Sequence, residues 1–144
     1  MSYSHIGGDS RASFPELESL FQTIESIMGF LPNSLLIMSK KPELMKAFQT
    51  LAGVVFSSKH LKLDLIQLIA LASSLSSGCK YCQAHTSHGA SVAGVTEEKI
   101  NGILKYQESD YFNETEKATL DLAFASGATP NQTEKKHFEE LEKY

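Results

Sequence analysis

The sequence lacks an apolar run long enough to cross a membrane. Its most apolar stretch, Leu65–Leu75, is interrupted by Gln67, Ser73 and Ser74, whereas a membrane-spanning helix needs about 20 largely apolar residues. Residues 1–11 are polar and do not show the charged segment followed by an apolar run that marks a secretory signal peptide. We therefore expect a cytoplasmic protein that does not bind membranes.

The sequence also lacks a basic cluster. It has 13 Lys and Arg residues against 17 Asp and Glu residues, a formal net charge of −4, and its lysines are spread among acidic residues. Binding to nucleic acid or to an anionic membrane surface needs clustered positive charge. The charge pattern therefore argues against nucleic acid as a partner.

Cysteine is scarce, since the chain of 144 residues contains only Cys79 and Cys82. In a reducing cytoplasm, such residues rarely form a purely structural disulfide. A cytoplasmic CxxC pair is more often a redox couple or part of a metal site. The two cysteines are therefore the first candidates for chemistry.

Helical periodicity dominates the rest of the chain. Apolar residues recur at three- and four-residue spacing, which is typical of amphipathic helices. No Val- and Ile-rich alternating run indicates a strand. We predict an all-α, single-domain helical bundle over residues 1–144, with a flexible tail over residues 1–12. Helices are expected from a Ser13–Glu16 capping box, from Asn33, from Pro42, over Leu61–Ser77, over Cys79–Ala93, over Glu97–Leu104, over Glu114–Ser126 and after an Asn131–Glu134 capping pair.

The most informative segment begins at Gly78, which is expected to end one helix just before Cys79 opens the next. The free N–H groups and the dipole of a helix N-terminus stabilise a thiolate, the reactive form of cysteine. Lys80 adds a positive charge nearby. Because residues three apart on a helix are neighbours, Cys79 and Cys82 can form a disulfide without unfolding the helix.

Two histidines follow the cysteines on the same predicted helix. His85 lies one turn beyond Cys82 and is a candidate general base, or an imidazolium partner for the thiolate. His88 lies a further turn along, and an ordinary hydrogen-bonded residue is an equal alternative for it. Tyr81 is more often a packing residue than an acid. His5, His60 and His137 have no motif around them and are predicted to be surface residues.

A zinc site is the main alternative for this segment. Cys79, Cys82, His85 and His88 could be written as four ligands. On a helix, however, Cys79 and His88 would be about 13.5 Å apart along the axis, so one tetrahedral ion cannot reach both. A site with two cysteines and one histidine, completed by water or a distant residue, stays open. The chemistry predicted for the cysteine pair requires no metal and no organic cofactor.

The run Ala72–Thr86, with its Cys-Lys-Tyr-Cys-Gln-Ala-His core, resembles the carboxymuconolactone decarboxylase superfamily in its alkyl hydroperoxidase D-like, or peroxidase-related, branch. The resemblance extends over roughly residues 29–128. It implies an all-helical fold of the alkyl hydroperoxidase D-like type and assembly into trimers or hexamers. It also implies that Cys82 attacks a peroxide and that Cys79 resolves the product.

The sequence departs from that family pattern at two positions. Members of the branch carry a Glu twelve residues before the first cysteine, where this chain has Gln67, and a His four residues after the second, where it has Thr86. An amide can orient a partner but cannot pass a proton as an acid does. His85 and His88 flank Thr86. Either His85 alone serves as the base, or the peroxidase activity is weak.

The leading hypothesis is therefore an antioxidant thiol peroxidase or disulfide reductase. The Cys79/Cys82 pair would reduce hydrogen peroxide or an organic hydroperoxide, and a lipoyl or thioredoxin-like dithiol protein would reset the pair by exchange. Two alternatives stay open: a lactone decarboxylase of the carboxymuconolactone type, and a non-enzymatic zinc-binding or assembly module. An apolar surplus on Leu44–Val55 and Leu61–Ser77 also predicts a homo-oligomer.

Overall fold

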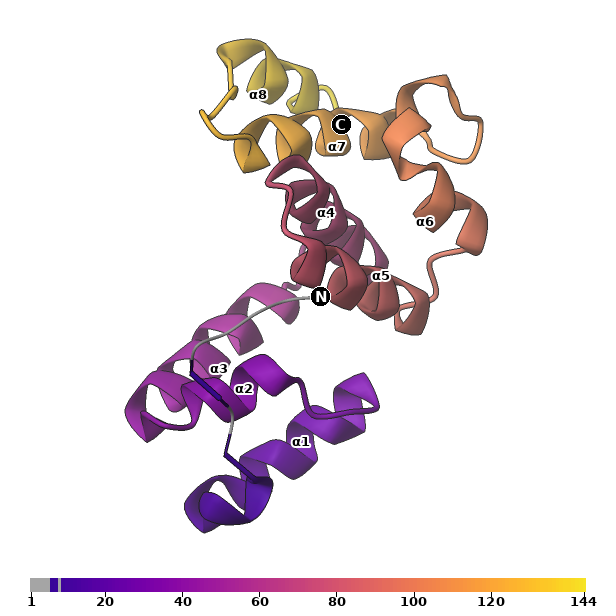
Figure 1. Ribbon diagram of the computed structural model, residues 1–144. Coiled ribbons are helices and arrows are strands. Elements are labelled where there is room, and N and C mark those ends of the chain that lie inside the picture. The colour runs from indigo at the N-terminus through magenta and orange to yellow at the C-terminus, as the bar shows by residue number, and fades with distance from the viewer. Residues whose placement is uncertain (1–5, 8) are drawn as a thin grey trace. The chain divides into compact units, whose positions relative to one another are not determined.

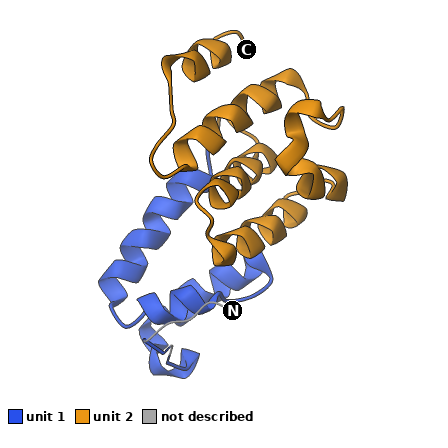
Figure 2. Ribbon diagram, turned by 45° about the horizontal axis from the view of Figure 1, so that its top comes forward, with its two compact units in different colours: residues 1–58 blue, residues 59–144 orange. Residues whose placement is uncertain are grey.

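The computed structural model describes residues 6–7 and 9–144, and all of its regular elements are helical (Figure 1). The predicted all-α class is thus confirmed for the described part of the chain. The chain forms two compact units, residues 1–58 and residues 59–144 (Figure 2). The single-domain assignment stays a prediction. No helix among the described residues is both long and apolar enough to cross a membrane.

The described part of the first unit contains three α-helices, α1 (Glu18–Met28), α2 (Asn33–Met38) and α3 (Pro42–Phe56). Its core joins residues from all three helices and from the turns before them. Gly29 ends α1 in the left-handed conformation, with φ of 79°, which a residue without Cβ adopts at little cost. The buried apolar residues of this core are Phe14, Leu17, Phe21, Ile24, Leu35 and Met45.

The start of the first helix differs from the prediction. Two 3-10 turns, Arg11–Ser13 and Pro15–Leu17, precede α1, and no capping bond from the Ser13 side chain to a backbone N–H is present. Arg11 instead reaches α1, where its guanidinium lies 2.7 Å from Glu18 and 2.6 Å from Glu25. Residues 1–5, including His5, and residue 8 of the predicted tail lie outside the described residues.

The second unit is built around α4 (Leu63–Ser76), which packs against both α5 (Lys80–Val92) and α7 (Glu114–Gly127). Its other helical segments are α6 (Glu97–Gly102), a 3-10 helix over Ile103–Glu108, and α8 (Lys135–Leu141). The central position predicted for the Leu61–Ser77 segment is confirmed. The buried core here comprises Leu68, Leu71, Ala72, Ala90, Val95, Ile103, Phe112, Leu120 and Ala123.

Helices α4 and α7 approach closely through small residues. A Cβ added to Gly127 would lie 2.8 Å from the backbone of Ser73, so only glycine fits there. The Ser73 hydroxyl donates to the carbonyl of Ala123 at 3.3 Å, and the Ser76 hydroxyl donates to that of Phe124 at 2.6 Å. Ser73, which interrupts the apolar stretch, and Ser76, which follows it, therefore join the two helices.

The last helix begins later than the Asn131–Glu134 pair predicted. Asn131 stays in the preceding turn, where its side chain bonds the backbone of Ser126 and Thr133. Glu134 itself caps α8, and its N–H donates to Nδ1 of His137 at 2.9 Å. The predicted cap was wrong because the short Asn side chain satisfies local turn bonds first.

Candidate redox site

The junction between α4 and α5 places Cys79 at the start of a helix, as predicted. Gly78 adopts the left-handed conformation, with φ of 70°, and so turns the chain out of α4. Cys79 is the N-cap of α5, and its Sγ accepts a hydrogen bond from the Cys82 N–H at 3.3 Å. One free N–H group of the helix end is thus directed at the sulfur.

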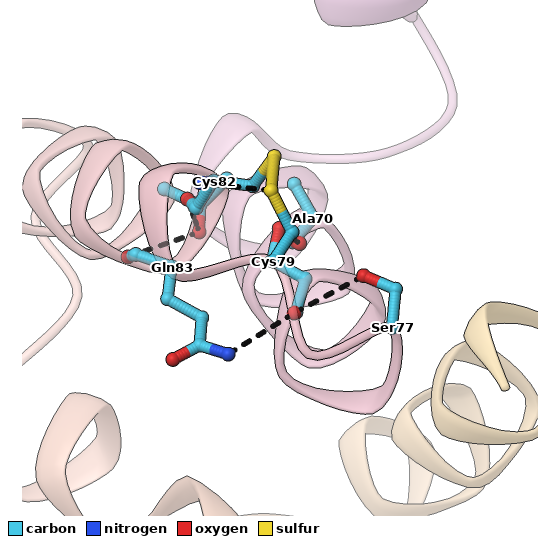
Figure 3. Close-up of a disulfide and its surroundings, with 7 residues drawn as sticks. Ala70, Ser77, Cys79, Cys82 and Gln83 are labelled. Carbon is cyan, nitrogen blue, oxygen red and sulfur yellow. Dashed lines mark hydrogen bonds between the residues drawn. A yellow bond between two sulfur atoms is a disulfide. The ribbon is translucent and has the colours of Figure 1, made fainter. Parts of the chain in front are cut away.

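Cys79 and Cys82 form a disulfide across the first turn of α5 (Figure 3). Their Cα atoms are 5.3 Å apart, within the range that a disulfide spans. The helix continues without interruption to Val92, so oxidation is compatible with the intact fold. Both cysteines are partly exposed to solvent.

The carbonyl of Ser74 holds this turn in place. It accepts hydrogen bonds from the Cys79 N–H at 3.2 Å, from the Gln83 side-chain amide at 3.3 Å and from the Ser77 hydroxyl at 3.2 Å. Figure 3 shows the Gln83 side chain extending from α5 toward the end of α4. No pattern in the sequence indicated this role of Gln83, because only the three-dimensional fold brings it to that carbonyl.

His85 lies one turn after Cys82, as predicted, and is half-buried. Its ring stacks on that of Tyr81, with ring centroids 6.0 Å apart and an angle of 14° between the planes. Burial lowers the pKa of His85 below its usual 6.5, and the nearby His88 lowers it further. A lower pKa favours the neutral imidazole, which is the form that can accept a proton. His88 is exposed on the outer face of α5.

Gln67 lies on α4 and faces the turn of α5 that contains Gly89. A Cβ added to Gly89 would lie 2.6 Å from the Gln67 Oε1, so the absence of a side chain at position 89 makes room for the amide. Gly89 follows Cys82 by seven residues, which puts Gln67 beside the same side of α5. The hydroxyl of Thr86 donates to the Cys82 carbonyl at 2.8 Å and so is bonded within the helix.

No group of three or more His, Cys, Asp and Glu side chains over residues 6–7 and 9–144 is arranged to hold a metal ion.

Two open cavities of about 670 and 550 Å³ lie elsewhere, along α7 and α8. They share Asp121, Lys136 and His137. Of the predicted surface histidines, His60 is exposed and His137 is half-buried. Neither cavity is lined by a cysteine.

Residues 42–125 match the model of the carboxymuconolactone decarboxylase family, and this segment includes α3, α4, α5 and nearly all of α7. The chain belongs to the carboxymuconolactone decarboxylase family. The resemblance stated from the Cys-Lys-Tyr-Cys-Gln-Ala-His core is thus confirmed at the level of the family. Membership of the alkyl hydroperoxidase D-like branch stays a prediction.

Two solved structures of the debrominase Bmp8 are similar to the whole chain. The first is a cysteine-to-alanine variant in complex with 2,3,4-tribromopyrrole; it has 37% identity and a TM-score of 0.91, over 99% of this chain and 76% of that one. The second is the apo form, with 38% identity and a TM-score of 0.90 over the same shares. No curated protein gives a significant match. The similarity supports the fold assignment over nearly all of the chain.

Proposed function

We propose that this protein is a dithiol–disulfide oxidoreductase that reduces a small electrophile with the Cys79/Cys82 pair. The observation that carries the proposal is the disulfide at the start of α5, with the Cys82 N–H directed at the Cys79 sulfur. A pair that can be oxidised without disturbing its helix can supply two electrons and then be restored by an external dithiol.

The substrate class that we favour is a halogenated heteroaromatic compound. Its support is the 37% identity to a debrominase whose structure contains 2,3,4-tribromopyrrole. That structure is a cysteine variant, which agrees with a role for cysteine in the debrominase. The same chemistry is a reasonable expectation for this chain, because the CxxC pair lies in the matched region.

The proposed reaction balances as a two-electron reduction. One thiolate attacks the bromine atom; an S–Br bond forms, the C–Br bond breaks, and the electron pair stays on the ring carbon, which takes up a proton. The second thiolate then attacks the brominated sulfur and expels bromide, which forms the disulfide. The net change converts the aryl bromide and the dithiol into the dehalogenated ring, the disulfide and hydrogen bromide. No metal or organic cofactor takes part.

Residues along α5 and on the adjoining part of α4 can be assigned proposed roles. His85, kept neutral by burial, takes the proton of the attacking thiol and returns it to the ring carbon. The family resemblance assigns the attack to Cys82, whereas the hydrogen bond from the helix N–H favours Cys79 as the more stable thiolate. Gln67, beside the same side of α5, is a supporting residue that could orient a bound ring through its amide.

Hydroperoxide reduction is the second candidate. Its support is the Cys-Lys-Tyr-Cys-Gln-Ala-His core, which resembles the peroxidase-related branch. Here the thiolate attacks a peroxide oxygen and becomes sulfenic acid, and the partner thiol then condenses with it and releases water. A hydroperoxide and the dithiol thus give an alcohol, water and the disulfide. Both candidates need the same reset by a lipoyl or thioredoxin-like protein.

Bromide release and peroxide consumption separate the two candidates. Reduced protein would be mixed with a series of brominated pyrroles, or with hydrogen peroxide or cumene hydroperoxide, in the presence of excess dithiothreitol. The favoured proposal expects catalytic release of bromide that is lost in Cys82→Ser and in Cys79→Ser. Gln22→Met, a change far along the chain in α1, is the matched control. Reduction of peroxide without release of bromide would support the second candidate. The absence of both reactions would contradict the proposal.

Lactone decarboxylation, the reaction that gives the family its description, is less well supported. That chemistry does not require a pair of thiols, and it leaves the disulfide of α5 without a use. Release of carbon dioxide from the carboxymuconolactone, unaffected by Cys82→Ser, would favour this function over both redox candidates.

A further inference from the structure

The two open cavities along α7 and α8 lie next to each other, since both are lined by Asp121, Lys136 and His137. The two helices pack against each other (Figure 1), and every residue that lines the cavities belongs to the second unit. Their volumes of about 670 and 550 Å³ fall within the range of small-molecule sites. We call the two cavities together the α7–α8 groove. Helix α8 lies outside residues 42–125, which match the family model.

Asp121 brings a negative charge to the place where the two cavities meet. Its Oδ1 accepts hydrogen bonds from the Tyr106 hydroxyl and from the Gln107 side-chain amide. Burial and the bond to Asp121 raise the pKa of Tyr106 to about 12, so both donors are neutral in neutral solution. No Lys, Arg or His over residues 6–7 and 9–144 forms an ion pair with Asp121. The charge of this half-buried carboxylate is therefore not balanced by a cation of the described chain.

The basic residues of the groove already have partners. Lys117 Nζ lies 3.3 Å from Glu114 Oε1, and Lys136 Nζ lies 2.8 Å from Glu134 Oε2. His137 accepts the Glu134 N–H at its Nδ1 at 2.9 Å, so its ring is neutral in this arrangement. The ionised residues that line the groove are Asp121, Glu114, Glu134, Glu140, Lys117 and Lys136. Acidic groups outnumber basic ones among them, and the groove therefore favours a positively charged ligand.

The larger cavity adds an aromatic ring and a buried hydroxyl. Phe124 lines this cavity, and its ring stacks on that of Tyr106, with centroids 5.4 Å apart. An aromatic ring held at a cavity wall offers contact to the apolar part of a ligand. Thr133 also lines this cavity, and its buried Oγ1 has no hydrogen-bond partner among the described residues, although buried hydroxyls normally have one. The wall of the larger cavity therefore lacks one polar partner.

We propose that the α7–α8 groove binds a small organic cation that carries an ammonium group on an apolar body. The ammonium group donates to Asp121, whose Oδ2 accepts no hydrogen bond from the described chain, and the apolar body lies against Phe124. A bond between two charged groups is roughly twice as strong as one between neutral groups. A metal ion fits less well, because no three His, Cys, Asp or Glu side chains in the described part of the chain are arranged to hold one. Neither cysteine lines the groove, so this site is separate from the redox pair.

Calorimetric titration of the native chain with benzylamine tests the proposal. Benzyl alcohol has the same ring without the charge and is expected to bind about tenfold more weakly. Asp121→Asn keeps a side-chain oxygen for the Tyr106 hydroxyl but removes the charge, and should weaken the binding of benzylamine by a similar factor. Glu139→Gln removes the same charge from an exposed position of α8 outside the groove and should leave the binding unchanged. No binding of benzylamine, or equal binding of the amine and the alcohol, would overturn the proposal.

NMR of the native chain locates the site even if Asp121→Asn fails to fold. Benzylamine is expected to shift the backbone amide signals of Phe124 and of residues 131–137, and shifts confined to other parts of the chain would overturn the assignment to the groove. Nα-acetyl-lysine methylamide presents the same ammonium group as part of a peptide. Weaker binding of this peptide-like probe than of benzylamine would support a free amine as the ligand. Binding at least as tight would overturn a free amine and assign the cation to a lysine of a protein partner.

Discussion

Replacing Gln83 with Met tests how the α4–α5 junction supports the cysteine pair. Gln83 donates from its side-chain amide to the Ser74 carbonyl at 3.3 Å, and methionine has a similar length but no donor. Ser74 is 8% exposed, yet its carbonyl keeps the bonds from the Cys79 N–H and from the Ser77 hydroxyl. The change therefore removes one hydrogen bond and leaves no acceptor unpaired.

The expected cost follows from that single bond. One hydrogen bond stabilises a folded protein by about 0.5–1.5 kcal/mol, so unfolding of the reduced form should become easier by about 1 kcal/mol. In the oxidised form the disulfide already fixes the first turn of α5, and we expect a smaller loss. Because the reduced form is destabilised more, the reduction potential should become more negative, by up to about 20 mV.

The measurements are denaturant unfolding of both redox forms and a redox titration against glutathione. Gln22→Met is the matched control, because Gln22 donates only to the exposed Glu18 side chain one turn away. Equal destabilisation of the oxidised and reduced forms, with an unchanged potential, would refute the reasoning that the Gln83 bond supports the reduced pair in particular. A variant as stable as the native chain in both redox forms would show that the Gln83 hydrogen bond does not stabilise the protein.

Five further predictions concern His85, two helix glycines and the attacking cysteine. His88→Gln should raise the pKa of His85, which NMR titration measures; because burial still lowers this pKa, it should stay below the usual 6.5. Because its pKa is lowered in the folded state, His85 binds fewer protons there than in the unfolded chain. The free energy of unfolding should therefore rise with pH up to about 6.5 and then level off. A flat profile would contradict the shift of the His85 pKa. Gly127→Ala should lower the free energy of unfolding by about 1–3 kcal/mol, because the added Cβ would lie 2.8 Å from the Ser73 backbone. Gly89→Ala should be tolerated, because the flexible Gln67 amide can move away. A lower unfolding temperature for Gly89→Ala than for Gly127→Ala would contradict this account. Sulfenic acid formed with peroxide should be trapped by dimedone in Cys79→Ser but not in Cys82→Ser if Cys82 attacks, and the opposite result would assign the attack to Cys79.

The sequence predicted most of the helices because local signals set their ends. Gly78 and Cys79 marked the junction that the structure confirms, and Thr96 caps α6 through its side chain as expected. The prediction was wrong at Ser13, where Arg11 forms ion pairs with residues seven and fourteen positions along the chain. Such contacts depend on how the turns fold back, and helical spacing does not encode them.

The candidate site was predicted mainly along α5, and the family resemblance added Gln67 of α4. Cys79, Cys82, Tyr81 and His85 lie on one short segment, so helical geometry was enough to relate them. Gln83 and its acceptor Ser74 belong to different helices, and their contact follows from the turn at Gly78. The sequence pattern predicted a peroxide as substrate, whereas the proposed brominated substrate rests on similarity to a debrominase and not on any residue pattern in the chain.

The central claim is that Cys79 and Cys82 act together as a redox couple, and a thiol titration tests it most directly. Free thiols in the reduced protein would be counted before and after one equivalent of a brominated pyrrole or of hydrogen peroxide, and again after addition of a dithiol. The account predicts that both thiols disappear together with at least one of these oxidants and that both return with the dithiol. Persistence of both thiols with the brominated pyrrole and also with hydrogen peroxide would contradict it.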